Sequence, residues 1–233
     1  MRQLTLDLLR PAPASLDNFV AGPNREAVHT LQAIAADERR VRFVHLWGAP
    51  ATGKSHLLAA LGGLSLGPEA PLAAFRLPRN GRLVTVDDCD QLDTDRQHAL
   101  FHLYNQVLAQ TGMALVSASR SAPVAMTVRE ELRTRLAWGL VLQLQPLTDE
   151  DRLQALRAAA LASGAGVADE VLAYLATRKA RDMRSQLQWL QALDRYALER
   201  KRPLTLPLLR ELESRQSLED ETACAGKLDT LHD

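Results

Sequence analysis

The residues best suited to chemistry form the segment from Gly48 to Ser55, which spells G-x-x-x-x-G-K-S. Its glycines let the backbone curl so that N–H groups point at phosphate oxygens, while Lys54 neutralises the phosphates and Ser55 offers a hydroxyl to Mg²⁺. A helix starting directly after the loop directs its positive N-terminal end at the same anion. The pattern predicts a site for the phosphates of ATP or ADP, made by Gly48, Ala49, Pro50, Ala51, Thr52, Gly53, Lys54 and Ser55.

Two neighbouring carboxylates follow an apolar run that begins at Leu83, and the first of them, Asp87, lies 33 residues beyond Lys54 (87 − 54). The run has the composition of a β-strand, and the end of a parallel strand is where such sheets hold ligands. We therefore expect Asp87 to support Mg²⁺ and Asp88 to polarise an attacking water. The later acidic residues of this region, Asp90, Asp93 and Asp95, fit a solvated loop and a helix cap instead.

Alternating apolar runs and amphipathic segments must position these groups. Short apolar runs predict strands at 42–47, 82–86, 113–118 and 140–144, with a weaker edge strand at 72–77. Helical spacing of apolar residues follows the phosphate loop from residue 54 and recurs at 95–109 and 128–137. This alternation predicts an α/β fold with a parallel sheet covered by helices on both faces.

The character of the chain changes after Pro146, because everything from there to about Glu213 has a helical pattern. Thr148 and Asp151 have the spacing of a capping box, which marks the start of a helix. We therefore predict a small C-terminal helical lid domain. The predicted divisions are residues 1–10 as a separate peptide, 11–146 as the nucleotide-binding α/β domain, 147–213 as the lid, and 214–233 as a disordered tail.

Composition limits the location and the partners. Lys plus Arg and Asp plus Glu both number 28, so bulk charge gives no argument for direct nucleic-acid binding. Two cysteines are too few for a disulfide scaffold, and no apolar run has the length of a signal peptide or a membrane span. We expect a cytoplasmic protein that is not associated with a membrane.

With the phosphate loop, the acidic strand end and the helical appendage in place, the chain resembles the DnaA-related AAA+ family, and its short Hda-type members in particular. Four more segments carry the resemblance: Ser15–Asn24, Leu100–Asn105, Leu132–Gly139 and Leu144–Glu150. The first resembles the segment that frames adenine, which implies nucleotide contacts from Val20 and Gly22. The last resembles the hinge into the lid.

The resemblance also implies roles for single polar residues. Arg135 matches the arginine finger that reaches the nucleotide of a neighbouring subunit, although an ordinary surface arginine would fit the same position. Arg184 matches the lid arginine called sensor II, within a stretch rich in solvated basic residues. Ser117 or Ser119 takes the sensor I position, where the family often carries an acid, and this departure puts hydrolysis by the chain itself in doubt.

The N-terminal residues resemble the peptide by which replication proteins dock on the β sliding clamp of DNA polymerase III. An extended segment with a glutamine and spaced leucines can fill a polar notch and an apolar cleft. The predicted contacts are Gln3, Leu4, Leu6 and Leu8. Packing of these leucines on their own domain is the alternative, which the DnaA-like module behind them makes less attractive.

Together these features predict a regulator of replication initiation that binds ADP or ATP with Mg²⁺, is tethered to the DNA-loaded clamp, and uses Arg135 to stimulate hydrolysis of DnaA-bound ATP. DNA would be contacted mainly through the clamp. A self-contained clamp-loader- or helicase-loader-like ATPase subunit is the alternative, and a metabolic P-loop kinase ranks last. An initiator is disfavoured, because only some twenty residues follow the lid where DnaA carries its DNA-reading domain. The sequence leaves open whether the chain forms a homodimer.

Overall fold

The computed structural model describes residues 13–38, 41–79, 81–164, 166–178 and 182–215. The chain forms two compact units that divide between Leu147 and Thr148. The first unit contains a five-stranded sheet of order β2-β3-β4-β1-β5, in which every pair of neighbours is parallel. Its strands are β1 (Phe43–Trp47), β2 (Leu64–Leu66), β3 (Leu83–Val86), β4 (Ala114–Ser119) and β5 (Leu140–Gln143).

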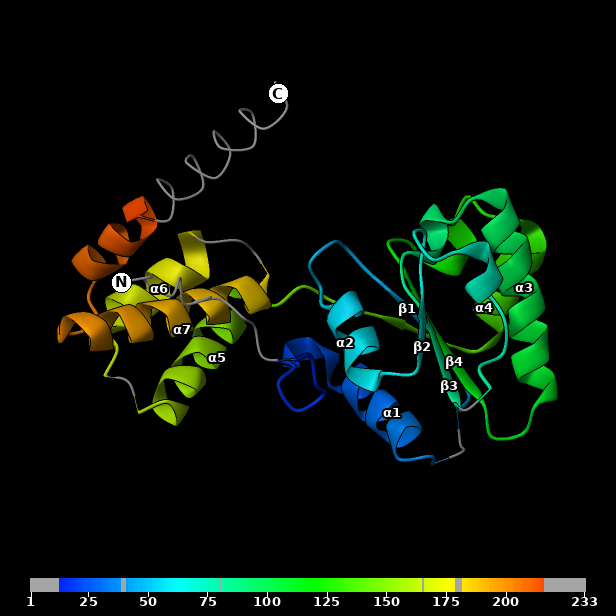
Figure 1. Ribbon diagram of the computed structural model, residues 1–233, viewed down its shortest axis with the longest axis horizontal. Coiled ribbons are helices and arrows are strands. Elements are labelled where there is room, and N and C mark those ends of the chain that lie inside the picture. The colour runs from blue at the N-terminus through cyan, green and yellow to red at the C-terminus, as the bar shows by residue number, and fades with distance from the viewer. Residues whose placement is uncertain (1–12, 39–40, 80, 165, 179–181, 216–233) are drawn as a thin grey trace, which may run out of the picture. The chain divides into compact units, whose positions relative to one another are not determined.

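Helices cover both faces of this sheet, with α1 and α2 over one face and α3 and α4 over the other (Figure 1). Their bounds are α1 (Arg25–Ala35), α2 (Lys54–Leu61), α3 (Thr94–Ala109) and α4 (Glu130–Trp138), with short 3-10 turns η1 (Gly22–Asn24), η2 (Leu72–Ala74), η3 (Cys89–Gln91) and η4 (Pro123–Ala125). This arrangement confirms the predicted doubly covered parallel sheet.

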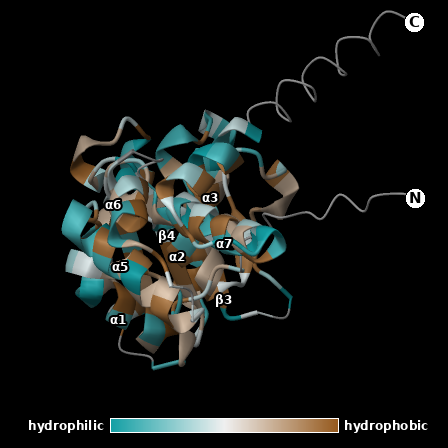
Figure 2. Ribbon diagram, turned by 90° about the vertical axis from the view of Figure 1, so that its left-hand side faces the viewer, coloured by the Kyte–Doolittle hydropathy of each residue, from teal (hydrophilic) through white to brown (hydrophobic). Residues whose placement is uncertain are grey.

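The apolar pattern of the strands explains the two-sided core. Successive strand residues point to opposite faces. On β1, Val44 and Leu46 accordingly pack with α1 and α2, whereas Phe43 packs with α3 and α4. Banding of hydrophilic and hydrophobic residues along the helices is visible in Figure 2. The pattern is clear on α1, which turns Ala27, Val28 and Leu31 to the core and polar residues outward.

The predicted edge strand at 72–77 is wrong. The edge strand is β2, at Leu64–Leu66, and residues 72–74 form the turn η2 instead. Two glycines that follow α2 explain the difference, because Gly62 and Gly63 have φ of 69° and 86°, which ends the helix. A side chain on Gly63 would meet the carbonyl oxygen of Leu83 at 2.5 Å, so glycine also permits the close approach of β2 to β3.

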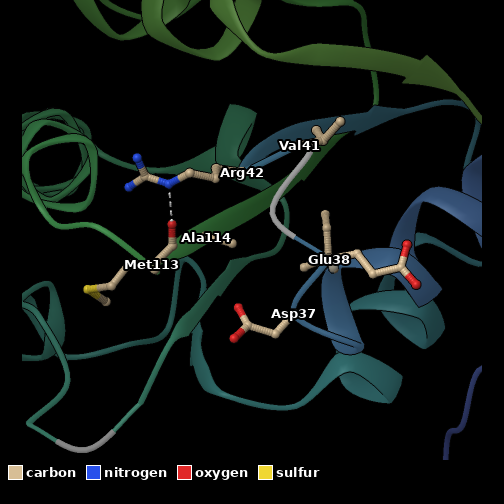
Figure 3. A pocket seen from close by; sticks show the side chains of 8 residues that line it. Asp37, Glu38, Val41, Arg42, Met113 and Ala114 are labelled. Atoms are coloured by element: carbon tan, nitrogen blue, oxygen red, sulfur yellow. Dashed lines mark hydrogen bonds between the residues drawn. The ribbon is translucent and has the colours of Figure 1, made fainter.

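Arg42 anchors the end of the sheet at which the strands begin. Its Nε donates to the carbonyl of Met113 at 2.8 Å, and an Nη donates to the carbonyl of Val107 at 2.7 Å, near the end of α3. Figure 3 shows this guanidinium beside a small hollow that Asp37 and Glu38 also line. All five strands begin at this end of the sheet, and the phosphate loop follows the carboxyl end of β1. The hollow therefore lies at the opposite end of the sheet from the phosphate loop.

The second unit is helical, as predicted. It contains α5 (Asp149–Ala162), α6 (Asp169–Arg178), α7 (Met183–Arg200) and a further helical segment from residue 206, packed around its own apolar core. The predicted capping box is present, since Thr148 Oγ1 accepts from the Asp151 N–H at 3.0 Å and Asp151 Oδ2 accepts from the Thr148 N–H at 3.0 Å. Within the described ranges, no helix combines the length and apolar character that a membrane span requires.

Candidate nucleotide-binding site

The phosphate loop connects β1 to α2, and its two fixed glycines are required by close contacts. A side chain on Gly48 would meet the carbonyl oxygen of Leu144 at 2.3 Å, where the loop passes the end of β5. Gly53 has φ of 95°, and a side chain there would meet the Phe19 ring at 2.5 Å. Ala51, between them, also has a positive φ of 63°. This alternation of backbone conformations is the kind that turns successive N–H groups toward an anion.

Lys54 opens α2 and folds back over the loop. Its ammonium donates to the carbonyls of Gly48 at 2.7 Å and Ala49 at 2.8 Å, and only 7% of the residue is exposed. Burial lowers the pKa of this lysine, and the carboxylates of Asp88, Asp87 and Asp90 partly offset that effect. The ammonium is therefore held inside the loop, near the carboxylates that follow β3.

The carboxylates occupy the turn where β3 ends. The Asp87 N–H donates to the carbonyl of Leu66 at 2.9 Å, and Asp87 Oδ1 accepts from the Asp88 N–H at 2.9 Å. Asp88 has φ of 42°, a conformation that aspartate tolerates better than most residues, and it directly precedes η3. Mg²⁺ in nucleotide sites is usually bound by oxygen ligands from one or two side chains and from the phosphates. The Ser55 hydroxyl and the Asp87 carboxylate fit such an ion.

The N-terminal segment lies against the loop. Phe19 covers Gly53 and stacks at an angle on His56 of α2, with ring centroids 5.5 Å apart. His56 Nε2 lies 3.0 Å from the carbonyl oxygen of Ser15. Val20 is half-buried, and Gly22 begins η1 with φ of 47°. This places the segment expected to frame the base directly beside the loop expected to bind the phosphates.

Asn24 is an anchor that the sequence did not indicate. Its side chain donates to the carbonyl of Gln145 at 2.9 Å and accepts from the Gln145 N–H at 2.7 Å, so it pairs with the backbone like a neighbouring strand residue. Only 4% of Asn24 is exposed. The residue follows Gly22-Pro23 before a helix, a place where asparagine usually serves as a cap, so no local signal identified this long-range contact.

The two serines of the sensor I region have partners that we did not anticipate. His45 of β1 lies 2.8 Å from Ser117 Oγ through Nδ1 and 2.8 Å from Ser119 Oγ through Nε2, and all three residues are buried. Ser119 Oγ donates to the carbonyl of Ser121 at 2.6 Å, so it accepts from Nε2–H and Nδ1 accepts from Ser117. Because residues two apart on a strand share a face, both hydroxyls point at the imidazole within the sheet.

Burial lowers the pKa of His45 from 6.5 to about 4, so the imidazole is neutral at physiological pH. In the structure both hydroxyls contact a histidine that bridges β1 and β4, and the expected contact of Ser117 or Ser119 with nucleotide stays a prediction. A lone histidine in an apolar run gives no local hint of such partners. The hint lay instead in Ser117 and Ser119, which are polar, two apart and within another apolar run.

The two arginines expected to act on nucleotide, Arg135 and Arg184, are distant from the phosphate loop in the sequence. Arg135 is on α4, with its guanidinium 5.0 Å from the ring centroid of Trp138 and 6.0 Å from that of Phe101. Arg184 is exposed in the first turn of α7, in the second unit, after the cap formed by Asp182. Gln3, Leu4, Leu6 and Leu8 lie outside the described residues.

Comparisons with known proteins identify relatives of both units. A family model described as "Hda, lid domain" matches residues 149–212. A Haemophilus influenzae protein, named as uncharacterized, is 30% identical over 227 residues, which cover 91% of this chain and 98% of the relative.

Solved structures share the fold of this chain. Domain III of the Thermotoga maritima replication initiation protein DnaA is 22% identical, covers 86% of this chain and 95% of its own, and has a TM-score of 0.68. The Thermotoga maritima RuvB Holliday junction branch migration motor is 17% identical, with a TM-score of 0.64, and the match covers 85% of this chain and 70% of RuvB. A replication initiator DnaA bound to AMPPCP and single-stranded DNA is 19% identical, with a TM-score of 0.63, covering 81% of this chain and 67% of DnaA.

The parallel sheet, the phosphate loop between β1 and α2 and the helical second unit define a protein of the AAA+ class. The matching lid and the DnaA-like neighbours then specify the group within that class. The chain belongs to the family of Hda- and DnaA-related AAA+ proteins.

Proposed function

We propose that this protein regulates replication initiation by stimulating hydrolysis of ATP bound to DnaA. The observation that carries the proposal is the pairing, in one chain, of a lid that matches the Hda family with a charged arginine on the surface helix α4. The resemblance assigns that arginine, Arg135, to a partner's nucleotide. DnaA is then the ATP-bearing partner, and the reaction is completed between two proteins.

The phosphate loop would bind ADP or ATP with Mg²⁺. Gly48, Gly53 and Lys54 provide the backbone shape and the charge, and Ser55 with Asp87 would hold the ion. Mg²⁺ neutralises charge on the phosphates when it is bound. The ligand would serve to order the domain, since a molecule that binds only the folded state stabilises it by RT ln(1 + [L]/Kd).

Weak or absent hydrolysis by the chain itself is part of the proposal. Asp88 is available to polarise a water, but Ser117 and Ser119 direct their hydroxyls at His45. A residue that senses the γ-phosphate must present a polar group to it. The resident nucleotide is accordingly proposed as a structural ligand, and the hydrolysed one as that of DnaA.

In trans, Arg135 would stabilise the negative charge that builds up on the transferred phosphoryl group. Such an arginine typically changes the hydrolysis rate by a factor of about 10³ to 10⁵. In the part of the chain that the structure describes, no ion pair occupies Arg135, so its charge is not neutralised by a neighbouring carboxylate. The same charge would complement the phosphates of the partner.

Attachment to the β sliding clamp is the second half of the proposal. The clamp would be bound by Gln3, Leu4, Leu6 and Leu8. The protein would therefore reach DNA only after the clamp has been loaded on it. DNA is then contacted mainly through the clamp, in the cytoplasm near the nucleoid. Arg184, which matches sensor II, is proposed to contact the protein's own nucleotide.

The decisive experiment measures hydrolysis of DnaA-bound ATP with clamp loaded on DNA. Arg135→Ala should remove the stimulation, whereas Arg133→Ala, which deletes the same charge from the same helix, should retain most of it. Equal stimulation by wild type and Arg135→Ala would overturn the proposal. For the tether, a Gln3→Ala/Leu6→Ala variant should lose clamp binding and Thr5→Ala should keep it.

A clamp-loader- or helicase-loader-like ATPase subunit is the alternative. It is supported by Lys54 and by Asp87 and Asp88, which follow the ends of β1 and β3. That function requires vigorous turnover by the chain itself. Turnover that is lost in Asp88→Asn, in the absence of DnaA, would favour the alternative over the regulator.

A further inference from the structure

An exposed tryptophan adjoins the proposed arginine finger. Trp138 ends α4 with 63% of its surface exposed, and the guanidinium of Arg135 lies 5.0 Å from its ring centroid. Residues three apart on a helix share a face, so the two side chains meet without distorting α4. Single exposed aromatic residues are common on protein surfaces, so the observation that matters is the contact of Trp138 with Arg135.

A second ring approaches the same guanidinium from a different helix. Phe101 of α3 has its ring centroid 6.0 Å from Arg135 Cζ, and both residues line a hollow with Glu130, Glu131 and Thr134. Cations within about 6 Å of a ring centroid are attracted by the negative face of the ring. Arg135 thus lies within this range of one ring on its own helix and one on α3.

The aromatic contacts leave the charge of Arg135 available. An ion pair would restrain the side chain too, but it would also neutralise the charge that a phosphate must meet. Glu131, the nearest candidate along the helix, pairs with Arg129 at 3.5 Å instead. Aromatic rings restrain the guanidinium while keeping its charge and its N–H donors for a partner.

We propose that Trp138 is a positioning residue that holds Arg135 in the conformation in which it reaches the partner's nucleotide, an inference that rests on the proposed function. Arginine carries about 2 kcal/mol of rotamer entropy. A side chain already held by an aromatic ring loses less of that freedom when it enters the partner's site. This smaller loss of rotamer entropy is expected to raise the rate of the reaction step and to leave the binding of the two proteins unchanged.

The kinetic test separates holding from docking. The rate of hydrolysis of DnaA-bound ATP is measured against the concentration of this protein, with clamp and DNA present. Trp138→Leu should lower the rate at saturation about two- to fivefold, the change that a cation–π contact implies, and leave the half-saturating concentration unchanged. Trp138→Phe, which keeps a ring, should recover most of the rate. Leu198→Ala, which removes a similarly exposed apolar side chain from the second unit, should have no effect.

A spectroscopic measurement tests the geometry without any activity. The Arg135 side-chain N–H resonance, assigned by its loss in Arg135→Lys, should lie upfield of the other arginines because of the ring current of Trp138. It should move toward them in Trp138→Leu and less so in Trp138→Phe. An unchanged resonance would show that the ring does not hold the guanidinium.

Each outcome decides one of the two proposals. A raised half-saturating concentration with an unchanged saturating rate would make Trp138 a docking contact and overturn the positioning role, as would full activity of Trp138→Leu. Stimulation by Arg135→Ala equal to wild type would instead overturn the proposed function. In that case a resonance that still moves in Trp138→Leu would show that the aromatic contact exists without that use.

Discussion

Burial of His45 between Ser117 and Ser119 makes the stability of the first unit depend on pH. His45 is 1% exposed, and burial lowers its pKa from 6.5 to about 4. Below pH 6.5 the unfolded chain takes up a proton at this residue while the native protein does not, so stability falls as the pH falls toward 4. Above pH 6.5 both states are neutral, and the full stability is present.

The size of the effect follows from the two pKa values. For a single site, lowering the pH from 7.5 to 5 costs about 2 kcal/mol of the free energy of unfolding, and the limit below pH 4 is about 3 kcal/mol. The perturbation is His45→Gln, since an amide can also donate and accept but does not titrate. We expect this variant to lose that component of the pH dependence.

Urea unfolding at pH 7.5 and pH 5, followed by the fluorescence of neighbouring Trp47, measures the effect. His29, an exposed histidine of α1, supplies the control variant His29→Gln, which should keep the wild-type response. If His45→Gln and wild type lose the same free energy between the two pH values, His45 is not the source and the reasoning fails. NMR titration of the His45 imidazole in the native protein provides an independent check of its pKa.

Three further substitutions test other parts of the fold. Gly53→Ala should lower the free energy of unfolding in urea by about 1–3 kcal/mol, because Gly53 has a positive φ and lies against the Phe19 ring. It should also weaken ADP binding, as measured by calorimetry. Gly62→Ala is the control that separates backbone strain from the ring contact, because Gly62 has a positive φ but open space around it. If the two cost the same, the Phe19 contact contributes nothing. Asn24→Ala removes both bonds to Gln145 and should cost about 1–2 kcal/mol in the first unit, with an unchanged denaturation midpoint counting against the anchor. Thr148→Ala breaks the capping box and should cost about 1 kcal/mol in the second unit, as measured by helical circular dichroism during unfolding; an effect confined to the first unit would contradict this assignment.

Local patterns in the sequence were sufficient for the parts of the molecule whose physics is local. The phosphate loop needs glycines and a lysine at fixed spacing, and the capping box needs two residues three apart, so both could be recognised from the residues themselves. The alternation of apolar runs likewise predicted the parallel sheet, because burial on both faces requires it. The prediction of the edge strand was wrong because the apolar residues around Gly62 and Gly63 resembled a continuous helix. The two glycines in fact end α2, and β2 begins directly after them.

Only the tertiary structure decided which polar groups meet across the sheet. His45 and Ser119 are 74 residues apart in the chain, and Asn24 and Gln145 are 121 apart, so no local spacing links them. Strand register places the imidazole against two serines and thereby gives the sensor I hydroxyls a partner within the core. In the same way, the packing of α3 on α4 puts Phe101 beside Arg135. The residue types that can do chemistry are written in the sequence, but the neighbours that hold or occupy them are set by contacts between distant segments.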